Sequence, residues 1–328
     1  MTAPFDVTAI GNAIVDVIAP ATDAFLAAEA MTKGAMTLID ETRAASLYAR
    51  MGPGIEASGG SAANTVAGVA SFGGKAAFIG KCASDSLGEV FSHDMRSIGA
   101  RFEAAPLKDG PATGRCLVNV TPDGERTMST FLGAAVCLTP ADVGVELIEA
   151  AATVYLEGYL FDAPQARLAF AKAAGLAHGA GRRIALTLCD AFVVERHRDA
   201  LIAFIDAQVD ILFANEAEIT ALFQTDDFAA AAKAVEGRVA IAALTRGAAG
   251  SLVVGSGVSH AVAAEAVEKV VDTTGAGDQY AAGFLFGLAR NHPLEVCGSL
   301  GSLAAAEVIS HFGPRPQTAL RDLAAALV

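Results

Sequence analysis

The sequence contains no tryptophan, only 18% charged residues and no uninterrupted apolar run that could cross a membrane. A membrane helix needs about 18 or more apolar residues, and every such window here is broken by charge, glycine or proline. The N-terminal residues also lack the basic and apolar regions of a signal peptide. We therefore expect a soluble, cytoplasmic protein without membrane contact.

Clusters of cysteine and histidine are missing as well. The five cysteines are scattered at positions 82, 116, 137, 189 and 297, and no two form a C-x-x-C pair. The six histidines form no H-E-x-x-H motif. This pattern predicts neither a disulfide framework nor a zinc site.

Two common nucleotide-binding motifs are also missing. Gly74-Lys75-Ala76 resembles the end of a Walker loop, but Val69 replaces its first glycine and Ala76 its Ser or Thr. No G-x-G-x-x-G follows a predicted strand, which argues against an NAD-linked oxidoreductase. The net charge of −13 argues against nucleic acid as a partner. An enzyme that handles anions must then concentrate positive charge locally, from backbone N–H groups, a metal ion and a few basic side chains.

A polar, glycine-containing stretch, Asp-Thr-Thr-Gly-Ala-Gly-Asp at 272–278, runs directly into an apolar stretch with helical spacing. The N–H groups of Gly275, Ala276 and Gly277 are unhindered by large side chains and lie at the positive end of the expected helix dipole. Asp278 lies at the same place and would repel an anion unless it accepts a proton. The alternative is an acidic residue that only complements the helix dipole.

Apolar strands and helical patterns alternate along most of the chain, which is 53% apolar. This alternation predicts an α/β fold, with a mainly parallel sheet covered on both faces. We expect strands at 7–10, 153–156, 184–188, 211–214, 239–244, 251–254, 259–263 and 267–271. We expect helices at 140–150, 164–180, 195–207, 276–290, 293–310 and 317–327.

Some strand signals interrupt this rhythm. A hairpin pattern spans 114–131 around the turn Pro122-Asp123-Gly124. The pattern of residues 31–39 also differs from that of the surrounding helices. We assign these strands to a small β-sheet that covers the main body as a lid, inserted from about 12–40 and 101–132. The chain, 1–328, is otherwise predicted to be one domain.

Further candidate residues follow glycine turns or strand ends. Asn12 and Asp16 follow the first strand, where open α/β sheets bind ligands, although Asn12 could instead form an Asx-turn. A second turn precedes a helix and contains Gly59, Gly60, Ser61 and Asn64. Ser61 could serve only as the helix N-cap.

Two motifs follow later strands. Asn215 and Glu218 have the spacing of a capping box, or Glu218 could lie near Mg²⁺, held through water. Thr245, Gly247 and Gly250 could seat a nucleotide against the backbone, or form an ordinary strand connection.

The order and spacing of these motifs resemble the ribokinase-like (PfkB) carbohydrate and nucleoside kinases over nearly the whole chain. The resemblance implies a three-layer α/β sandwich with a β-lid, and phosphoryl transfer from ATP with Mg²⁺. Asp278 would be the catalytic base, with Gly275, Ala276 and Gly277 as the anion hole. Asn215, Thr245, Gly247, Gly250 and Ser302 would lie at the nucleotide site and Glu218 at the metal. Asp272 and Thr274 would lie where many members hold a monovalent cation such as K⁺.

The substrate end resembles the adenosine kinases of this family, which would place the chain in purine salvage. Gly11-Asn12-Ala13-Ile14-Val15-Asp16 resembles their ribose-binding segment, joined by Gly59, Gly60, Ser61 and Asn64. Arg126 could contact substrate or phosphate, or be a solvated hairpin charge. Tyr159 and Phe161 lie near the expected base-stacking positions, although the local sequence differs and Glu157 is unexpected there. A free-sugar kinase (ribose or fructose) and a catalytically silent nucleoside sensor are the alternatives, in a monomer or homodimer.

Overall fold

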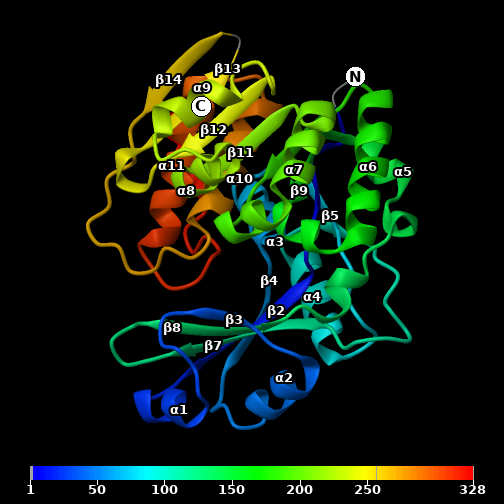
Figure 1. Ribbon diagram of the computed structural model, residues 1–328, viewed down its shortest axis with the longest axis vertical. Coiled ribbons are helices and arrows are strands. Elements are labelled where there is room, and N and C mark those ends of the chain that lie inside the picture. The colour runs from blue at the N-terminus through cyan, green and yellow to red at the C-terminus, as the bar shows by residue number, and fades with distance from the viewer. Residues whose placement is uncertain (1–2, 256, 328) are drawn as a thin grey trace.

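The computed structural model describes residues 3–255 and 257–327, which form two β-sheets flanked by helices (Figure 1). The larger sheet has the strand order β14-β13-β12-β11-β10-β9-β1-β5-β6. Neighbouring strands are parallel, except that β13 is antiparallel to both β12 and β14. In chain order the strands are β1 (Phe5–Ile10), β5 (Ala76–Ile79), β6 (Arg101–Phe102), β9 (Ala151–Glu157), β10 (Arg183–Thr187), β11 (Ile211–Asn215), β12 (Ile241–Thr245), β13 (Ser251–Gly255) and β14 (Val258–Val262).

Helices cover both faces of this sheet, because successive side chains of each strand point to opposite faces. In β9, Val154 and Leu156 belong to one apolar cluster, whereas Tyr155 belongs to the other. The first cluster includes α5 (Val145–Glu149), α6 (Pro164–Gly179), α7 (Ala191–Gln208), α8 (Glu216–Phe223) and α9 (Phe228–Val235). The second includes α3 (Ser61–Ser71), α4 (Ser86–Ser97), α10 (Ala276–Ala289) and α11 (Leu294–Ile309). The predicted three-layer α/β arrangement is therefore confirmed.

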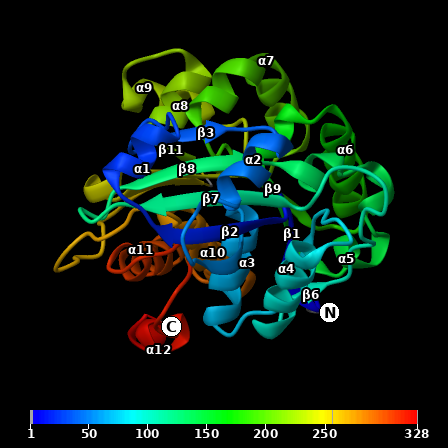
Figure 2. The same cartoon turned by 90° about the horizontal axis from the view of Figure 1, so that it is seen from below.

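The small sheet has the strand order β3-β8-β7-β2-β4 and lies below the main body in Figure 1 and in front of it in Figure 2. Its strands are β2 (Ile14–Pro20), β3 (Met36–Leu38), β4 (Ile55–Gly59), β7 (Gly114–Val120) and β8 (Arg126–Phe131). Two short helices, α1 (Asp23–Ala28) and α2 (Glu41–Tyr48), belong to the same part of the chain. The lid ranges 12–40 and 101–132 need two corrections, since β4 lies outside both and β6 belongs to the large sheet.

Only three residues separate β1 in the large sheet from β2 in the small sheet. Gly11 begins this crossing, and a Cβ there would lie 2.4 Å from Glu157 Oε2 and 2.5 Å from Ala62 Cβ. Glycine is therefore required for the close approach of these elements. The crossing carries the residues that follow β1 into the space between the two sheets.

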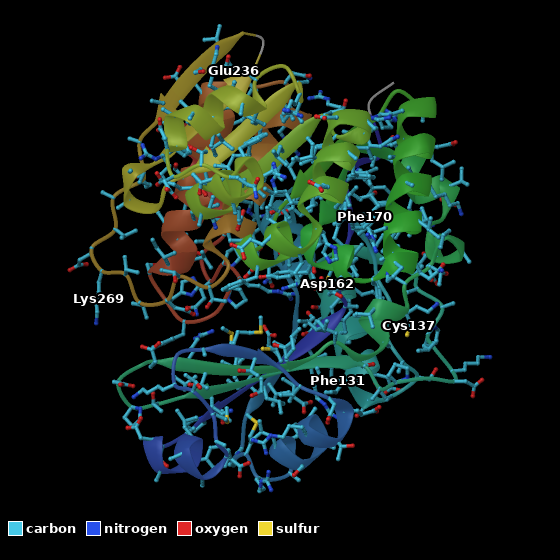
Figure 3. The ribbon with its side chains drawn as sticks, viewed as in Figure 1. Phe131, Cys137, Asp162, Phe170, Glu236 and Lys269 are labelled. Atoms are coloured by element: carbon cyan, nitrogen blue, oxygen red, sulfur yellow. The ribbon has the colours of Figure 1, made fainter. Side chains whose placement is uncertain are left out.

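Several predicted elements differ from the structure. No strand forms at 267–271, where the backbone is irregular. Val270 is 52% exposed and Lys269 projects from this loop away from the main body (Figure 3), so these residues bury no apolar face. The N–H groups of Val271 and Asp272 donate instead to the carbonyl of Ile309 at the end of α11.

Two predicted helices are shorter than expected. The segment 140–150 divides into η2 (Pro140–Asp142) and α5, because Gly144 stands at the N-cap of the second piece. The segment 317–327 contains only α12 (Leu320–Leu323) and η5 (Ala324–Ala326). The remaining 3-10 turns are η1 (Gly133–Cys137), η3 (Gly158–Asp162) and η4 (Gly247–Ala249). None of the described helices is both long and apolar enough to cross a bilayer.

Candidate active site

A cavity of about 630 Å³ lies between the small sheet and the ends of the large-sheet strands. The crossover Asn12, the turn before α3, the lid strands β7 and β8 and the loop before α10 all contribute to its wall. Asp162, labelled in Figure 3, lies at the edge of the main body that faces the small sheet. The predicted residues that line the cavity are Asn12, Asp16, Gly60, Ser61, Asn64, Arg126, Asn215, Glu218, Thr245, Thr274, Gly275, Ala276, Gly277 and Asp278.

The loop that precedes α10 has the geometry of an anion site. Gly275 is the N-cap with φ +79°, and a Cβ at this position would lie 2.7 Å from the Cα and O of Pro314. Glycine is therefore required both for the left-handed backbone and for the close contact. The first turn of a helix leaves its N–H groups without intrahelical partners, and here that turn faces the cavity. The N–H of Ala276 donates to the carbonyl of Thr273 at 3.2 Å.

Asp278 lies in this first turn, and both of its carboxylate oxygens accept hydrogen bonds from α3. Ser61 Oγ donates to Oδ1 at 2.6 Å and Asn64 Nδ2 donates to Oδ2 at 3.0 Å. Burial raises the pKa of Asp278, while these two bonds and the nearby Arg315 oppose the rise. The result is a carboxylate that is held in place and is a better proton acceptor than an exposed aspartate.

Ser61 is therefore not the N-cap of α3. Gly60 occupies the N-cap, and the Ser61 hydroxyl is directed to Asp278 instead. The sequence alternative for Ser61 is wrong.

Asn12 and Asp16 form a second polar group in the cavity wall. Asn12 donates its backbone N–H and Nδ2 to Glu157, at 3.2 and 2.6 Å, and its Oδ1 has no partner among the described residues. Asn12 is therefore not held in an Asx-turn. A Cβ on Gly59 would lie 2.5 Å from the Asp16 carboxylate, so glycine at 59 makes room for this side chain. Burial raises the pKa of Asp16 to about 6, although Arg315 and Arg126 lower it.

Glu157 is a buried carboxylate at the end of β9 that the sequence analysis noted but did not explain. It is 1% exposed and accepts a third bond from the N–H of Ala62 at 2.9 Å. Burial raises its pKa to about 7 despite these three donors. Because a carboxylate oxygen can only accept, Glu157 forces Asn12 to turn its Nδ2 toward it, which leaves the buried Asn12 Oδ1 without a partner among the described residues.

Asn215 and Glu218 do form the predicted capping box at the start of α8. Glu218 Oε2 accepts the N–H of Asn215 at 2.9 Å, and Asn215 Oδ1 accepts the N–H of Glu218 at 2.9 Å. Both side chains also line the cavity. Thr245 lies directly opposite Asn215 in the parallel pair β11–β12, so the two strand ends meet at one edge of the sheet.

Direct ligation of a metal is not supported in the described part of the chain, where no three His, Cys, Asp or Glu side chains converge on one point. Glu218 is 5% exposed, and burial raises its pKa to about 7, with Asp190 and Asp278 adding to the rise. A nearby cation would relieve this repulsion. Mg²⁺ keeps several waters and takes few protein carboxylates, so these residues fit an ion held through water.

Three residues of the predicted nucleotide site lie outside the cavity wall. Gly247 and Gly250 belong to the turn between β12 and β13, and Ser302 is buried in α11. Gly250 has φ +82°, and a Cβ there would lie 2.2 Å from the carbonyl of Val262, which explains this glycine by backbone packing alone.

Asp272 and Arg126 form an ion pair at 2.7 Å, with side chains that are 7% and 10% exposed. Arg126 is therefore not a solvated hairpin charge. Asp272 also accepts bonds from Thr274 and from the N–H of Gly313. The pair joins the first residue of β8 to the loop before α10.

Several residues at or beside the cavity were not predicted from the sequence. Arg315 Nε donates to Asn64 Oδ1 at 3.3 Å and so supports the amide that contacts Asp278. Phe192 and Cys189 line the cavity, and Phe192 is 69% exposed. Tyr159 lines it as predicted, but Phe161 is 2% exposed in the core and lies outside the wall. No local pattern marks Arg315, because its partner Asn64 is 251 residues away in the chain.

The chain matches the model of the pfkB family of carbohydrate kinases over residues 48–319. It is 28% identical to adenosine kinase of Saccharomyces cerevisiae, covering 96% of this chain and 97% of the yeast protein. The crystal structure of adenosine kinase from Sinorhizobium meliloti is 49% identical, with a TM-score of 0.92 and coverage of 99% and 100%. A probable sugar kinase from Rhizobium etli CFN 42 is 46% identical over both whole chains, with a TM-score of 0.93.

These likenesses confirm the ribokinase-like α/β fold with its second, small sheet. The family match covers most of the chain, including the glycine loop before α10. This protein belongs to the pfkB family of carbohydrate kinases.

Proposed function

We propose that the protein transfers the terminal phosphoryl group of ATP to the 5′-hydroxyl of adenosine. The observation that carries this proposal is Asp278, a buried carboxylate in the first turn of α10, beside the glycine loop that faces the cavity. A proton acceptor next to backbone N–H groups is the arrangement that phosphoryl transfer to a hydroxyl needs.

Asp278 accepts the hydroxyl proton as the oxygen attacks the terminal phosphorus. A new O–P bond forms while the bond from phosphorus to the bridging oxygen of ADP breaks, and Asp278 later releases the proton to water. Each carboxylate oxygen has about two lone-pair sites, so Asp278 can keep its bonds to Ser61 and Asn64 and still accept the substrate hydroxyl. The N–H groups of Gly275, Ala276 and Gly277 receive the charge on the transferring group.

Mg²⁺, when bound with ATP, neutralises charge on the phosphates. Glu218 would hold the ion through water, and Asn215 and Thr245 would contact the phosphates. Gly247, Gly250 and Ser302 would form an outer part of the nucleotide site, beyond the cavity wall.

The acceptor side of the cavity suits a ribose diol. Asn12 and Asp16 both line the cavity, and Asn12 Oδ1 is a buried acceptor without a partner among the described residues. Two acceptors at one place match two neighbouring hydroxyl donors. This feature supports a ribose-bearing substrate, free or attached to a base.

The lid side of the cavity favours the nucleoside over the free sugar. Six apolar side chains of this wall come from the lid segments, namely Ile14, Met36, Leu38, Val118, Met128 and Leu132. Leu38 is 55% exposed and Phe192, across the cavity, is 69% exposed. A flat heteroaromatic base would cover these surfaces, whereas a free sugar would leave them in water.

Release of ADP with a panel of adenosine, other nucleosides, ribose and fructose tests the proposal. We expect adenosine to have the highest kcat/KM. A higher value for ribose or fructose would assign the protein to the sugar kinases, and no turnover with any acceptor would support a silent sensor.

The role of Asp278 has its own test. Asp278→Asn removes the base and is expected to lower kcat by about 10² to 10⁴. The Kd of adenosine, measured by calorimetry, should stay close to that of the wild type. Near-normal turnover in this variant would refute the assignment of the base.

A further inference from the structure

The resemblance to the kinase family suggests a monovalent cation beside Asp272 and Thr274. Such a cation needs oxygen ligands that still have free lone pairs. Asp272 is the only carboxylate suggested for this place, and its side chain is 7% exposed. Its hydrogen bonds therefore decide whether a cation fits.

Three hydrogen bonds and one ion pair already surround the Asp272 carboxylate. Oδ1 accepts from Thr274 N at 3.1 Å and from Thr274 Oγ1 at 2.7 Å. Oδ2 accepts from Gly313 N at 2.9 Å and forms an ion pair with Arg126 Nη2 at 2.7 Å. A carboxylate offers about four lone-pair sites. Three are taken by hydrogen bonds, and the guanidinium of Arg126 lies against Oδ2, where a cation would have to approach.

Arg126 also supplies the charge that a cation would bring. A guanidinium cannot lose its proton in a protein, and a second cation on the same carboxylate would be repelled. Arg126 is 10% exposed, and its Cζ lies 5.6 Å from the ring centre of Phe312. The guanidinium is thus enclosed between the lid strand β8 and the loop at 312–313.

We propose that Arg126 takes the place of the monovalent cation, so that this protein neither binds nor needs K⁺. The lid arginine neutralises Asp272 and holds the loop that presents the backbone N–H groups of the anion site. The ion pair therefore couples the position of the lid strand β8 to the conformation of the loop before α10. The activity part of this inference rests on the proposed kinase function, whereas the cation-binding part does not.

The first test uses the wild-type protein without nucleotide. Its melting temperature is compared in KCl and in tetramethylammonium chloride at equal ionic strength, up to about 100 mM, where exposed charges are screened alike. We expect the same melting temperature in both salts. A saturable rise in melting temperature that is specific for K⁺ would overturn the proposal. This result does not depend on whether a phosphoryl acceptor is found.

The second test removes the guanidinium with Arg126→Met, which keeps an unbranched apolar side chain about as far as the Nε position and leaves Asp272 buried without its counter-charge. We expect the melting temperature to fall by roughly 5 °C in tetramethylammonium and K⁺ to recover part of that loss. Arg115→Met is the matched control, because Arg115 lies in the paired lid strand β7 but does not contact Asp272. If the melting temperature of Arg126→Met falls but K⁺ does not raise it again, or if it does not fall at all, then Arg126 does not replace a cation.

Turnover gives a third readout if adenosine is confirmed as acceptor. Wild-type kcat should change by less than about twofold between the two salts, and the Arg126→Met enzyme should lose at least about tenfold and respond to K⁺. Activation of the wild type by K⁺ well beyond twofold would refute the proposal. If neither the wild type nor the variants turn over adenosine, the proposed function is refuted. The melting temperatures then decide by themselves whether K⁺ binds.

Discussion

The orientation of the Asn12 amide is predicted to depend on the charge of Glu157. In Glu157→Gln, one oxygen can still accept the N–H groups of Asn12 and Ala62, which both bond to Oε2 in the wild type. The new amide NH₂ then faces Asn12 Nδ2, and two donors cannot bond. We expect Asn12 to rotate, so that its Oδ1 accepts from the introduced amide and its Nδ2 turns to the ligand.

The magnitude follows from the bonds that change. The number of protein hydrogen bonds stays the same, so the free energy of unfolding should change by only about 1 kcal/mol. The substrate diol, however, meets a donor where it had an acceptor, and loss of such a bond costs about 1–3 kcal/mol. KM for adenosine should therefore rise about 10- to 100-fold while kcat stays nearly constant.

Steady-state kinetics with adenosine and with its 2′-deoxy and 3′-deoxy analogues would measure this effect. The variant should discriminate less between adenosine and the analogue that lacks the hydroxyl bound by Asn12. Adding Asn12→Asp should recover part of the affinity, because a carboxylate accepts from the introduced amide and still offers an acceptor to the diol. An unchanged KM in Glu157→Gln, or no recovery in the double variant, would refute the reasoning.

Three further predictions concern the loop, the base pocket and pH. Gly275→Ala places a Cβ 2.7 Å from Pro314 at φ +79°, so denaturant unfolding should show a loss of about 1–2 kcal/mol or more, together with reduced kcat. Phe192→Ala should raise KM for adenosine by about tenfold and leave any ribose turnover unchanged, because stacking on a base is worth about 1–3 kcal/mol; equal effects on both would argue against a base contact. Glu157 and Glu218 have pKa values raised from 4.5 to about 7, so the stability they contribute is present below pH 4.5 and lost as pH rises to about 7. Glu218→Gln should therefore flatten the fall in urea stability over this range by on the order of 1–3 kcal/mol, and an unchanged slope would contradict the raised pKa.

Local sequence patterns were sufficient to predict those elements whose boundaries depend on neighbouring residues. The loop at 272–278 and the helix after it were predictable, because glycines and the start of a 3.6-residue period lie next to each other. The capping box of Asn215 and Glu218 is equally local. The strand expected at 267–271 failed because valines at 267, 270 and 271 do not show whether a neighbouring strand exists to pair with them.

The charges and orientations in the candidate site depend on contacts between distant segments. Asn64 and Asp278 are 214 residues apart, and Asn12 and Glu157 are 145 residues apart. Whether Glu157 is a surface charge or a buried acceptor depends on how α3 and the Asn12 crossing pack over β9, and periodicity does not encode that packing. The same holds for Arg126, which pairs with Asp272 only because the lid strand and the loop before α10 meet in space. The sequence determined which chemical groups are present, and the tertiary structure decided which of them meet, because burial and pairing are properties of packed elements.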